Sequence, residues 1–333
     1  MIARHLGVSK MTVSRALRGE STVSADLGDR VRRAAAEMGY RPDPEVSRMM
    51  THLRTVRENR QPQALGFVWT DRVAGKPSPW ASELFKGAES KAESLGYGLD
   101  VFEIKTGELS ARRIAEVMEN RGVRGFVLSP LVSRSRGHLQ MPWEKFSCVM
   151  IGLGFVRPAL NRVHHHHFLG MMTSMRQLRK EGFRRIGFFA DAQIDRRMFG
   201  AWSASFLSHH PLGVGLAEPL MFLPKSPTRR LFVDWVERAA PDVVLAPGVG
   251  TAKWLEAVPA MRRPEFATLS WSVGQPNVPG LDQQSDVLGA TAVELLVDQI
   301  HRNEQGVPDS PKLVMTAGVW RKSATVAAEK LIT

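Results

Sequence analysis

The chain has 333 residues, of which 43% are hydrophobic, and a formal net charge of +12 at pH 7. Its length allows two or three domains, and its single cysteine, Cys148, excludes an intramolecular disulfide framework and a multi-cysteine zinc site. The sequence has neither an apolar run long enough to span a membrane nor a signal peptide, so we expect a soluble, cytoplasmic protein.

The first 18 residues predict a helix-turn-helix. Gly7 separates two short amphipathic segments, and Ser9 can cap the second one. The apolar faces of these segments are formed by Ile2, Ala3, Leu6, Val13, Ala16 and Leu17. The outward positions of the second helix are Lys10, Met11, Thr12, Ser14, Arg15 and Arg18. All of these side chains except Met11 can donate hydrogen bonds to phosphates or base edges.

A third amphipathic helix is predicted after Val23-Ser24, which can cap it, and it ends at Gly39-Tyr40-Arg41-Pro42. Its buried stripe is expected to contain Val31, Ala34, Ala35 and Met38. Positive charge is concentrated in this part of the chain: residues 1–60 contain twelve Lys or Arg and seven Asp or Glu. A basic segment of this kind favours a polyanionic partner.

Several motifs in this region occur together: Ile2-Ala3, Gly7-Val8-Ser9, Thr12-Val13-Ser14-Arg15, Leu17-x-Gly19, Val23-Ser24 and Gly39-Tyr40-x-Pro42-x-Pro44. They resemble the headpiece of the lactose-repressor (LacI/GalR) family of bacterial transcription regulators. The resemblance implies a helix-turn-helix DNA-binding headpiece over 1–41 and a hinge helix and linker over 42–61. The headpiece begins abruptly, without the capping residue that the family places before Ile2, which indicates an upstream start or a first helix that frays.

The resemblance also implies how DNA is read. Lys10, Met11 and Arg15 would face the bases of a major-groove half-site, with Arg15 suited to a bidentate guanine contact. Ser9, Thr12, Ser14 and Arg18 would touch phosphates or flanking base edges. In the hinge, Met49 stands where the family inserts an apolar side chain into the minor groove; packing of the two hinges against each other is the alternative role.

From Ala64 onward, strand-like and helix-like segments alternate, which predicts parallel sheets covered by helices. The expected strands are 64–69, 99–104, 125–129, 148–153, 186–190, 220–223 and 242–246. The expected helices are 79–96, 110–120, a long helix ending at 180, 196–209 and 228–239. Cys148 lies in one of these apolar strands and is expected to be a buried structural thiol.

The family implies a two-lobed α/β domain, similar to periplasmic binding proteins, over 62–333, which also holds the dimer together. The first lobe is expected at about 62–157 and 288–318, and the second at about 158–287 and 319–327. The landmarks that resemble the family are 183–187, Arg197-x-x-Gly200, 241–244, Leu281 to Gln284 and 320–325. The residues expected to face an effector in the cleft between the lobes are Trp69, Asp71, Trp80, His166, Arg197, Trp271 and Gln284.

Two departures from the family concern this ligand. Pro247-Gly248 and Ser270-Trp271-Ser272 stand where the family often has side chains that hold sugar hydroxyls. The effector is therefore something other than a plain sugar, or other residues hold it, or none binds. Trp69 and Trp271 could stack on a sugar ring or an apolar ligand, and core packing is nearly as good an explanation for each.

The run His164 to His167 raises the question of a metal site. Neighbouring histidines on an extended backbone point to opposite faces, so at most two could bind one ion. We therefore expect no metal and no cofactor, and we expect His166 to be a polar residue on the cleft side.

The sequence thus predicts a DNA-binding transcriptional regulator. We expect a homodimeric repressor that binds a pseudo-palindromic operator and is modulated by a small ligand, such as a carbohydrate. An activator or an effector-independent repressor on the same scaffold is the alternative. A solute-binding protein and a sugar-modifying enzyme are remote alternatives, because the headpiece is present and no phosphate-loop, nucleophile-elbow or zinc-protease motif occurs.

Overall fold

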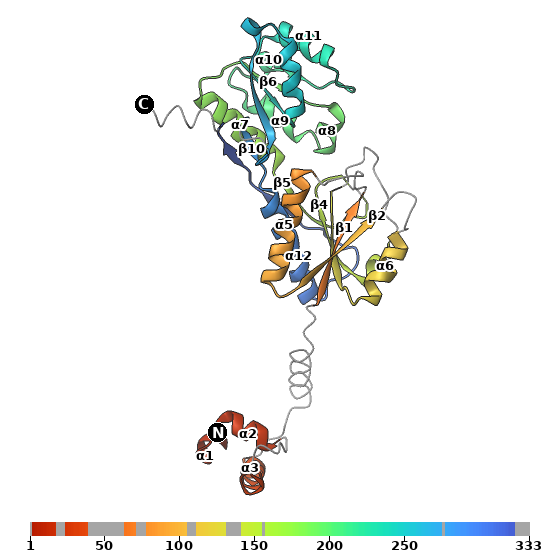
Figure 1. Ribbon diagram of the computed structural model, residues 1–333, viewed down its shortest axis with the longest axis vertical. Helices are drawn as coiled ribbons and strands as arrows, with labels where there is room; N and C mark the ends of the chain where they lie inside the picture. The colour runs from red at the N-terminus through yellow and green to blue at the C-terminus, as the bar shows by residue number, and fades with distance from the viewer. Residues whose placement is uncertain are drawn as a thin grey trace. The chain divides into compact units, whose positions relative to one another are not determined.

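The computed structural model describes residues 2–17, 24–38, 63–70, 78–104, 111–130, 141–154, 157–274 and 277–323 (Figure 1). Contacts within the chain divide it into two units, Met1–Gln61 and Pro62–Thr333. The expected hinge over 42–61 and the candidate residues Arg18, Met49 and Asp71 lie outside the described residues. In the described ranges, no helix is both long enough and apolar enough to cross a membrane.

The N-terminal unit contains the predicted helix-turn-helix, formed by α1 (Ile2–His5), α2 (Lys10–Leu17) and α3 (Ala25–Glu37). Its small core consists of Ile2, Val13, Ala16, Val31, Ala34 and Ala35. Gly7, with φ of 65°, makes the turn in the left-handed region, where glycine is strongly favoured. Two details of the prediction were wrong: the side chain of Ser24 makes no capping bond to α3, and Met38 is 42% exposed because it follows the end of that helix.

The first lobe of the second unit is built on a parallel sheet with the order β11-β5-β4-β3-β1-β2. Its strands are β1 (Ala64–Thr70), β2 (Gly98–Ile104), β3 (Gly125–Leu128), β4 (Ser147–Ile151), β5 (Asn161–His165) and β11 (Leu313–Thr316). Helices α5 (Pro79–Ser94) and α12 (Ser285–His301) cover one face, and α6 (Ala111–Asn120) covers the other (Figure 1). The turn η1 (Trp143–Lys145) precedes β4, where Cys148 is buried as predicted.

Helices α5 and α12 approach each other very closely, and two glycines allow this. A Cβ atom at Gly87 would lie 1.9 Å from the Asp286 carbonyl oxygen, and one at Gly289 would lie 2.0 Å from the Leu84 carbonyl oxygen. In both cases the obstacle is backbone, which cannot rotate away as a side chain can. The two helices must therefore separate to admit any larger residue.

We expect Gly289→Ala to destabilise the second unit by about 2 kcal/mol or more, since overpacking against fixed backbone forces the helices apart. Urea unfolding followed by tryptophan fluorescence measures this. Gly215→Ala is the matched control, because no atom lies within 4 Å of the added Cβ there. Equal midpoints for Gly289→Ala and wild type would contradict the close helix contact.

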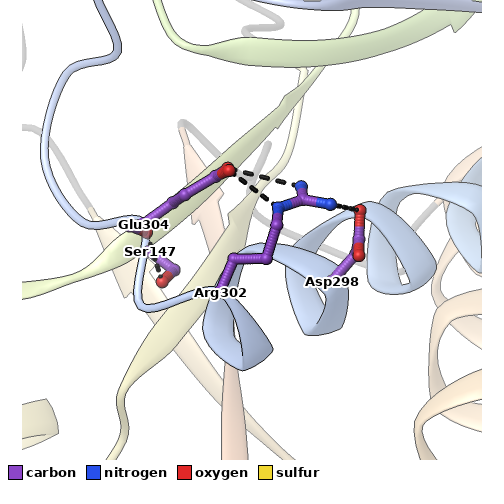
Figure 2. Close-up of polar contacts among 4 residues, drawn as sticks. All are labelled: Ser147, Asp298, Arg302 and Glu304. Atoms are coloured by element: carbon purple, nitrogen blue, oxygen red, sulfur yellow. Dashed lines mark hydrogen bonds and ion pairs between the residues drawn. The ribbon is translucent and has the colours of Figure 1, made fainter.

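The polar contacts in Figure 2 hold the carboxyl end of α12 to the sheet. Arg302 pairs with both Asp298 and Glu304. Ser147, at the start of β4, donates its hydroxyl hydrogen to the Glu304 carbonyl oxygen at 2.7 Å. The loop that leads from α12 to β11 is therefore attached to the amino end of β4.

The second lobe has a sheet with the order β12-β10-β9-β8-β6-β7, parallel except for the β10–β12 pair. The strands are β6 (Ile186–Phe189), β7 (Met221–Phe222), β8 (Val243–Ala246), β9 (Glu265–Trp271), β10 (Gly280–Asp282) and β12 (Val319–Arg321). The helices are α7 (His167–Lys180), α8 (Ala192–Arg197), α9 (Ala201–His209), α10 (Val214–Ala217) and α11 (Arg229–Ala239). The short turns are η2 (Glu218–Leu220), η3 (Val249–Ala257) and η4 (Ala260–Arg262).

The chain passes between the lobes three times: from β5 to α7, from β10 to α12, and from β11 to β12. These crossings correct the expected lobe boundaries. Strand β5 belongs to the first sheet, so the first crossing comes at His166 rather than at about 158, and α12 begins at Ser285 rather than 288. The helix expected over 196–209 is broken because Phe199 and Gly200 adopt positive φ.

Candidate functional site

Helix α2 carries the candidate DNA-reading surface. Arg15 is exposed on it, while Val13 and Ala16 face the core of the headpiece. Ser9 accepts a hydrogen bond from the Thr12 backbone N–H at 3.0 Å, and its hydroxyl lies 2.9 Å from that of Thr12. Ser9 therefore caps α2, and its hydroxyl is already engaged with Thr12.

Lys10, Met11 and Ser14 also lie on α2, but their side chains are outside the described part of the structure. Helical spacing places the Met11 position one turn before Arg15, away from Val13 and Ala16. The short helix α2 thus carries most of the positions that the sequence proposes for base and phosphate contacts.

In the second unit, ligands are expected at the carboxyl ends of the parallel strands, where the loops meet. At the ends of β1 and β3, the Thr70 N–H donates to the Ser129 hydroxyl at 3.0 Å. Beyond β6, Arg197 lies half-buried at the end of α8. Asp191 begins the same helix and accepts a hydrogen bond from the Gln193 N–H at 2.7 Å.

Two of the proposed effector residues pack in the first lobe. Trp69 is 8% exposed, and its ring centroid lies 4.9 Å from that of Phe67 and 6.3 Å from that of Phe85. Trp80 is half-buried against the same apolar cluster. Core packing therefore accounts for Trp69, whereas Trp80 keeps an exposed part at the start of α5.

Trp271 and Gln284 come together in a groove of about 730 Å³ between α5, α12 and the ends of β9, β10 and β12. The Arg321 guanidinium lies 5.7 Å from the centroid of the Trp271 ring and pairs with Asp282. Gln284 has φ of 52°, uncommon for a non-glycine residue, and its amide donates to the Ala317 carbonyl oxygen at 2.9 Å. Arg197 does not line this groove.

Glu83 also lines this groove. Its pKa is raised from the ordinary value because burial disfavours the charged form and because Asp282 and Asp286 lie nearby; a backbone hydrogen bond from Val273 acts in the opposite direction. The groove therefore holds charges of both signs beside an indole ring.

His166 caps α7: its Nδ1 accepts the Leu169 N–H at 3.2 Å. The neighbouring rings are buried, and burial, followed by the charges of the adjacent histidines, lowers the pKa of His165 to about 4 and that of His167 to about 3. Burial also lowers the pKa of His164. Across the described residues, no group of three potential ligands is arranged to hold a metal ion.

Sequence reasoning missed three polar residues of the second unit. Asp191 directly follows a predicted strand, which is a signal that could have identified it. Gln283 donates to the Leu269 carbonyl oxygen at 2.7 Å, while its neighbour Gln284 was chosen instead. Glu83 gave no signal, because an acidic residue on an amphipathic helix usually faces solvent.

The sequence of the first unit matches a known protein family. Residues 2–43 match the family described as "Bacterial regulatory proteins, lacI family". The helix-turn-helix segment of this chain is therefore similar in sequence to the DNA-binding part of bacterial regulatory proteins of the LacI family.

Two curated relatives agree with this similarity over limited lengths. The HTH-type transcriptional regulator Rv3575c of Mycobacterium tuberculosis is 33% identical over 129 residues, which cover 38% of this chain and 33% of the relative. The HTH-type transcriptional regulator GntR of Pseudomonas aeruginosa is 51% identical over 43 residues, or 13% of this chain and 12% of the relative. The alignments thus span a third or less of each relative.

Solved structures of LacI-family regulators share the whole fold. A complex of the transcriptional regulator CelR with cellobiose has a TM-score of 0.55 at 18% identity and covers 97% of both chains. The Lac repressor dimer bound to operator and the anti-inducer ONPF has a TM-score of 0.53 at 16% identity, with 96% of both chains covered. A LacI regulator from a Rhodococcus species has a TM-score of 0.58 at 14% identity over 79% of this chain and 97% of its own. The predicted headpiece and two-lobed α/β fold are confirmed.

Proposed function

We propose that this chain is a sequence-specific DNA-binding regulator of transcription of the LacI family, and that it acts as a repressor. The observation that carries the proposal is the exposed Arg15 on α2, within the segment that matches the family. Arginine can form two hydrogen bonds to the edge of guanine in the major groove, which specifies the base. Lys10, Met11, Thr12 and Ser14 would contact neighbouring edges and phosphates, and Arg18 and Met49 are proposed to extend the interface.

Ser9 is proposed to support base recognition by capping α2 and not by contacting DNA itself, because its hydroxyl is already hydrogen-bonded to Thr12. We propose that two copies of the chain bind the two halves of a pseudo-palindromic operator. The similar Lac repressor structure, a dimer bound to operator, supports this arrangement. Action on chromosomal DNA would take place in the cytoplasm.

The second unit is proposed to bind a small molecule that shifts the protein between two states of different operator affinity. Similarity to a cellobiose-bound regulator supports a carbohydrate ligand. The residues proposed to meet the ligand are Trp80, His166, Arg197, Trp271 and Gln284, together with Asp71. In this reading the chain works by binding and carries out no catalysis.

Selection from random duplexes tests the DNA-binding proposal. The full chain is incubated with the pool at moderate salt, and the bound fraction is amplified and sequenced. We expect a two-fold-symmetric site to be enriched, because each protomer presents one α2. Enrichment of no sequence above background would sink the proposal.

The selected duplex then serves as the probe for an effector. We expect at least one sugar or related metabolite to change its Kd, and a panel of these compounds is titrated against the complex. A complex that responds to none of them would favour the effector-independent alternative, with which the Pro247-Gly248 departure agrees.

A further inference from the structure

Arg32 on α3 reaches across to the carboxyl end of α2. Its Nη1 donates a hydrogen bond to the Ala16 carbonyl oxygen at 3.3 Å, and Ala16 is only 1% exposed. The carbonyl groups of the last helical turn have no partner within their own helix. A guanidinium at this end also suits the negative end of the helix dipole. Arg32 therefore caps α2 from a neighbouring helix.

The Arg32 side chain is itself held in place. Its Nη2 lies 2.7 Å from Oδ1 of Asp29, one turn earlier on α3. A guanidinium that binds a carboxylate and a carbonyl oxygen at once has little freedom to rotate. The contact thus fixes the position of α2 relative to α3, beyond the apolar packing between the two helices.

Gly28 leaves the room that this arrangement needs. A Cβ atom there would lie 3.3 Å from Nη2 of Arg32, a few tenths of an ångström closer than ordinary contact, and 3.4 Å from Nη1. Apart from proline, glycine is the poorest former of helix interiors. An alanine at this position would require the Arg32 guanidinium to shift by a few tenths of an ångström.

We propose that Arg32 is a positioning residue for DNA reading: by fixing the end of α2, it sets the orientation of Arg15, which directly precedes Ala16. The inference rests on the proposed function of α2. Hydrogen bonds to base edges tolerate only small displacements of the side chain that makes them. Arg32 thereby controls the ratio of specific to nonspecific affinity without touching a base.

The test uses the full chain and the selected duplex. Kd is measured for the wild-type chain and for Arg32→Met, with that duplex and with a scrambled duplex, at several salt concentrations. Methionine keeps the aliphatic part of the side chain and removes the hydrogen-bond donors. We expect the specific-to-nonspecific ratio to fall at least tenfold, with an unchanged salt slope. Arg33→Met is the matched control, an exposed arginine on the same helix, and should leave the ratio unchanged. Arg32→Lys should restore part of the ratio.

Two outcomes for Arg32→Met would overturn the inference. Equal losses for both duplexes with a shallower salt slope would make Arg32 a phosphate contact. An unchanged specific-to-nonspecific ratio, at temperatures where circular dichroism shows that the variant is fully folded, would mean that Arg32 has a structural role only. A wild-type chain that selects no site would overturn the proposed function and the inference with it.

Gly28→Ala gives a second, independent measurement. In the wild-type background the added methyl should displace the guanidinium and lower the ratio. In the Arg32→Met background the same methyl meets no guanidinium and should leave the ratio unchanged. Equal reductions in both backgrounds would contradict the role assigned to Gly28 and, with it, the fixed position of Arg32.

Discussion

Arg15→Ala is expected to remove most of the preference for the selected duplex while leaving nonspecific binding largely intact. A bidentate contact to guanine contributes about 1–3 kcal/mol of discrimination in each half-site. Two half-sites together correspond to a loss of roughly 30-fold to more than 10,000-fold in the specific-to-nonspecific ratio. Competition binding between the selected duplex and a scrambled duplex measures this ratio.

Arg15→Lys separates charge from geometry in the same experiment. Lysine keeps the positive charge, so the salt slope should equal that of wild type. It lacks the planar pair of donors, so most of the discrimination should still be lost. A variant of either kind that retained full preference would mean that Arg15 does not read the bases.

The sequence predicted the elements best where the pattern is local. Gly7 and Ser9 mark the turn and the cap of α2, and both act there as predicted because turn and capping chemistry depends on adjacent residues. Ser24 occupies the equivalent position before α3, but its side chain makes no capping hydrogen bond. A cap signature therefore identifies the start of a helix more reliably than it identifies the hydrogen bond.

Prediction was weaker where distant segments meet. Strand β5 was assigned to the wrong lobe, since it pairs with β4 and also with β11, which lies 151 residues later in the chain. Trp271 and Gln284 were chosen separately, yet they share a groove with Glu83, which the sequence gave no reason to select. The points at which the chain crosses between the lobes decide which polar residues lie close together.

The histidine run shows the same limit. Alternation along a strand predicts that His164 and His165 point to opposite faces, but His167 begins α7, and its ring lies 6.2 Å from that of His164 and 5.2 Å from that of His165. Burial is what makes this cluster chemically distinctive. Nδ1 of His167 is buried without a hydrogen-bond partner in the described part of the chain.

This burial makes the second unit sensitive to acid. In the folded state the pKa of His165 is about 4 and that of His167 about 3, against 6.5 for an unperturbed histidine. A backbone hydrogen bond with Thr316, followed by the charge of Asp282, acts against this shift at His165, while the neighbouring histidines reinforce it at both rings. Because the unfolded chain binds protons that the folded chain excludes, stability is full above pH 6.5 and falls as pH decreases toward the folded pKa values.

Between pH 6.5 and pH 5, each of the two rings should lower the free energy of unfolding by roughly 2 kcal/mol. Urea unfolding followed by tryptophan fluorescence measures it, since all eight tryptophans lie at or after residue 69 and report on the second unit alone. In His167→Phe, which keeps an aromatic ring beside Trp202, the dependence on pH should decrease by about one proton. His209→Phe, the same change at an exposed position, should retain most of the wild-type dependence. If His167→Phe and wild type lost stability equally on acidification, His167 could not be the buried neutral ring that the fold encloses.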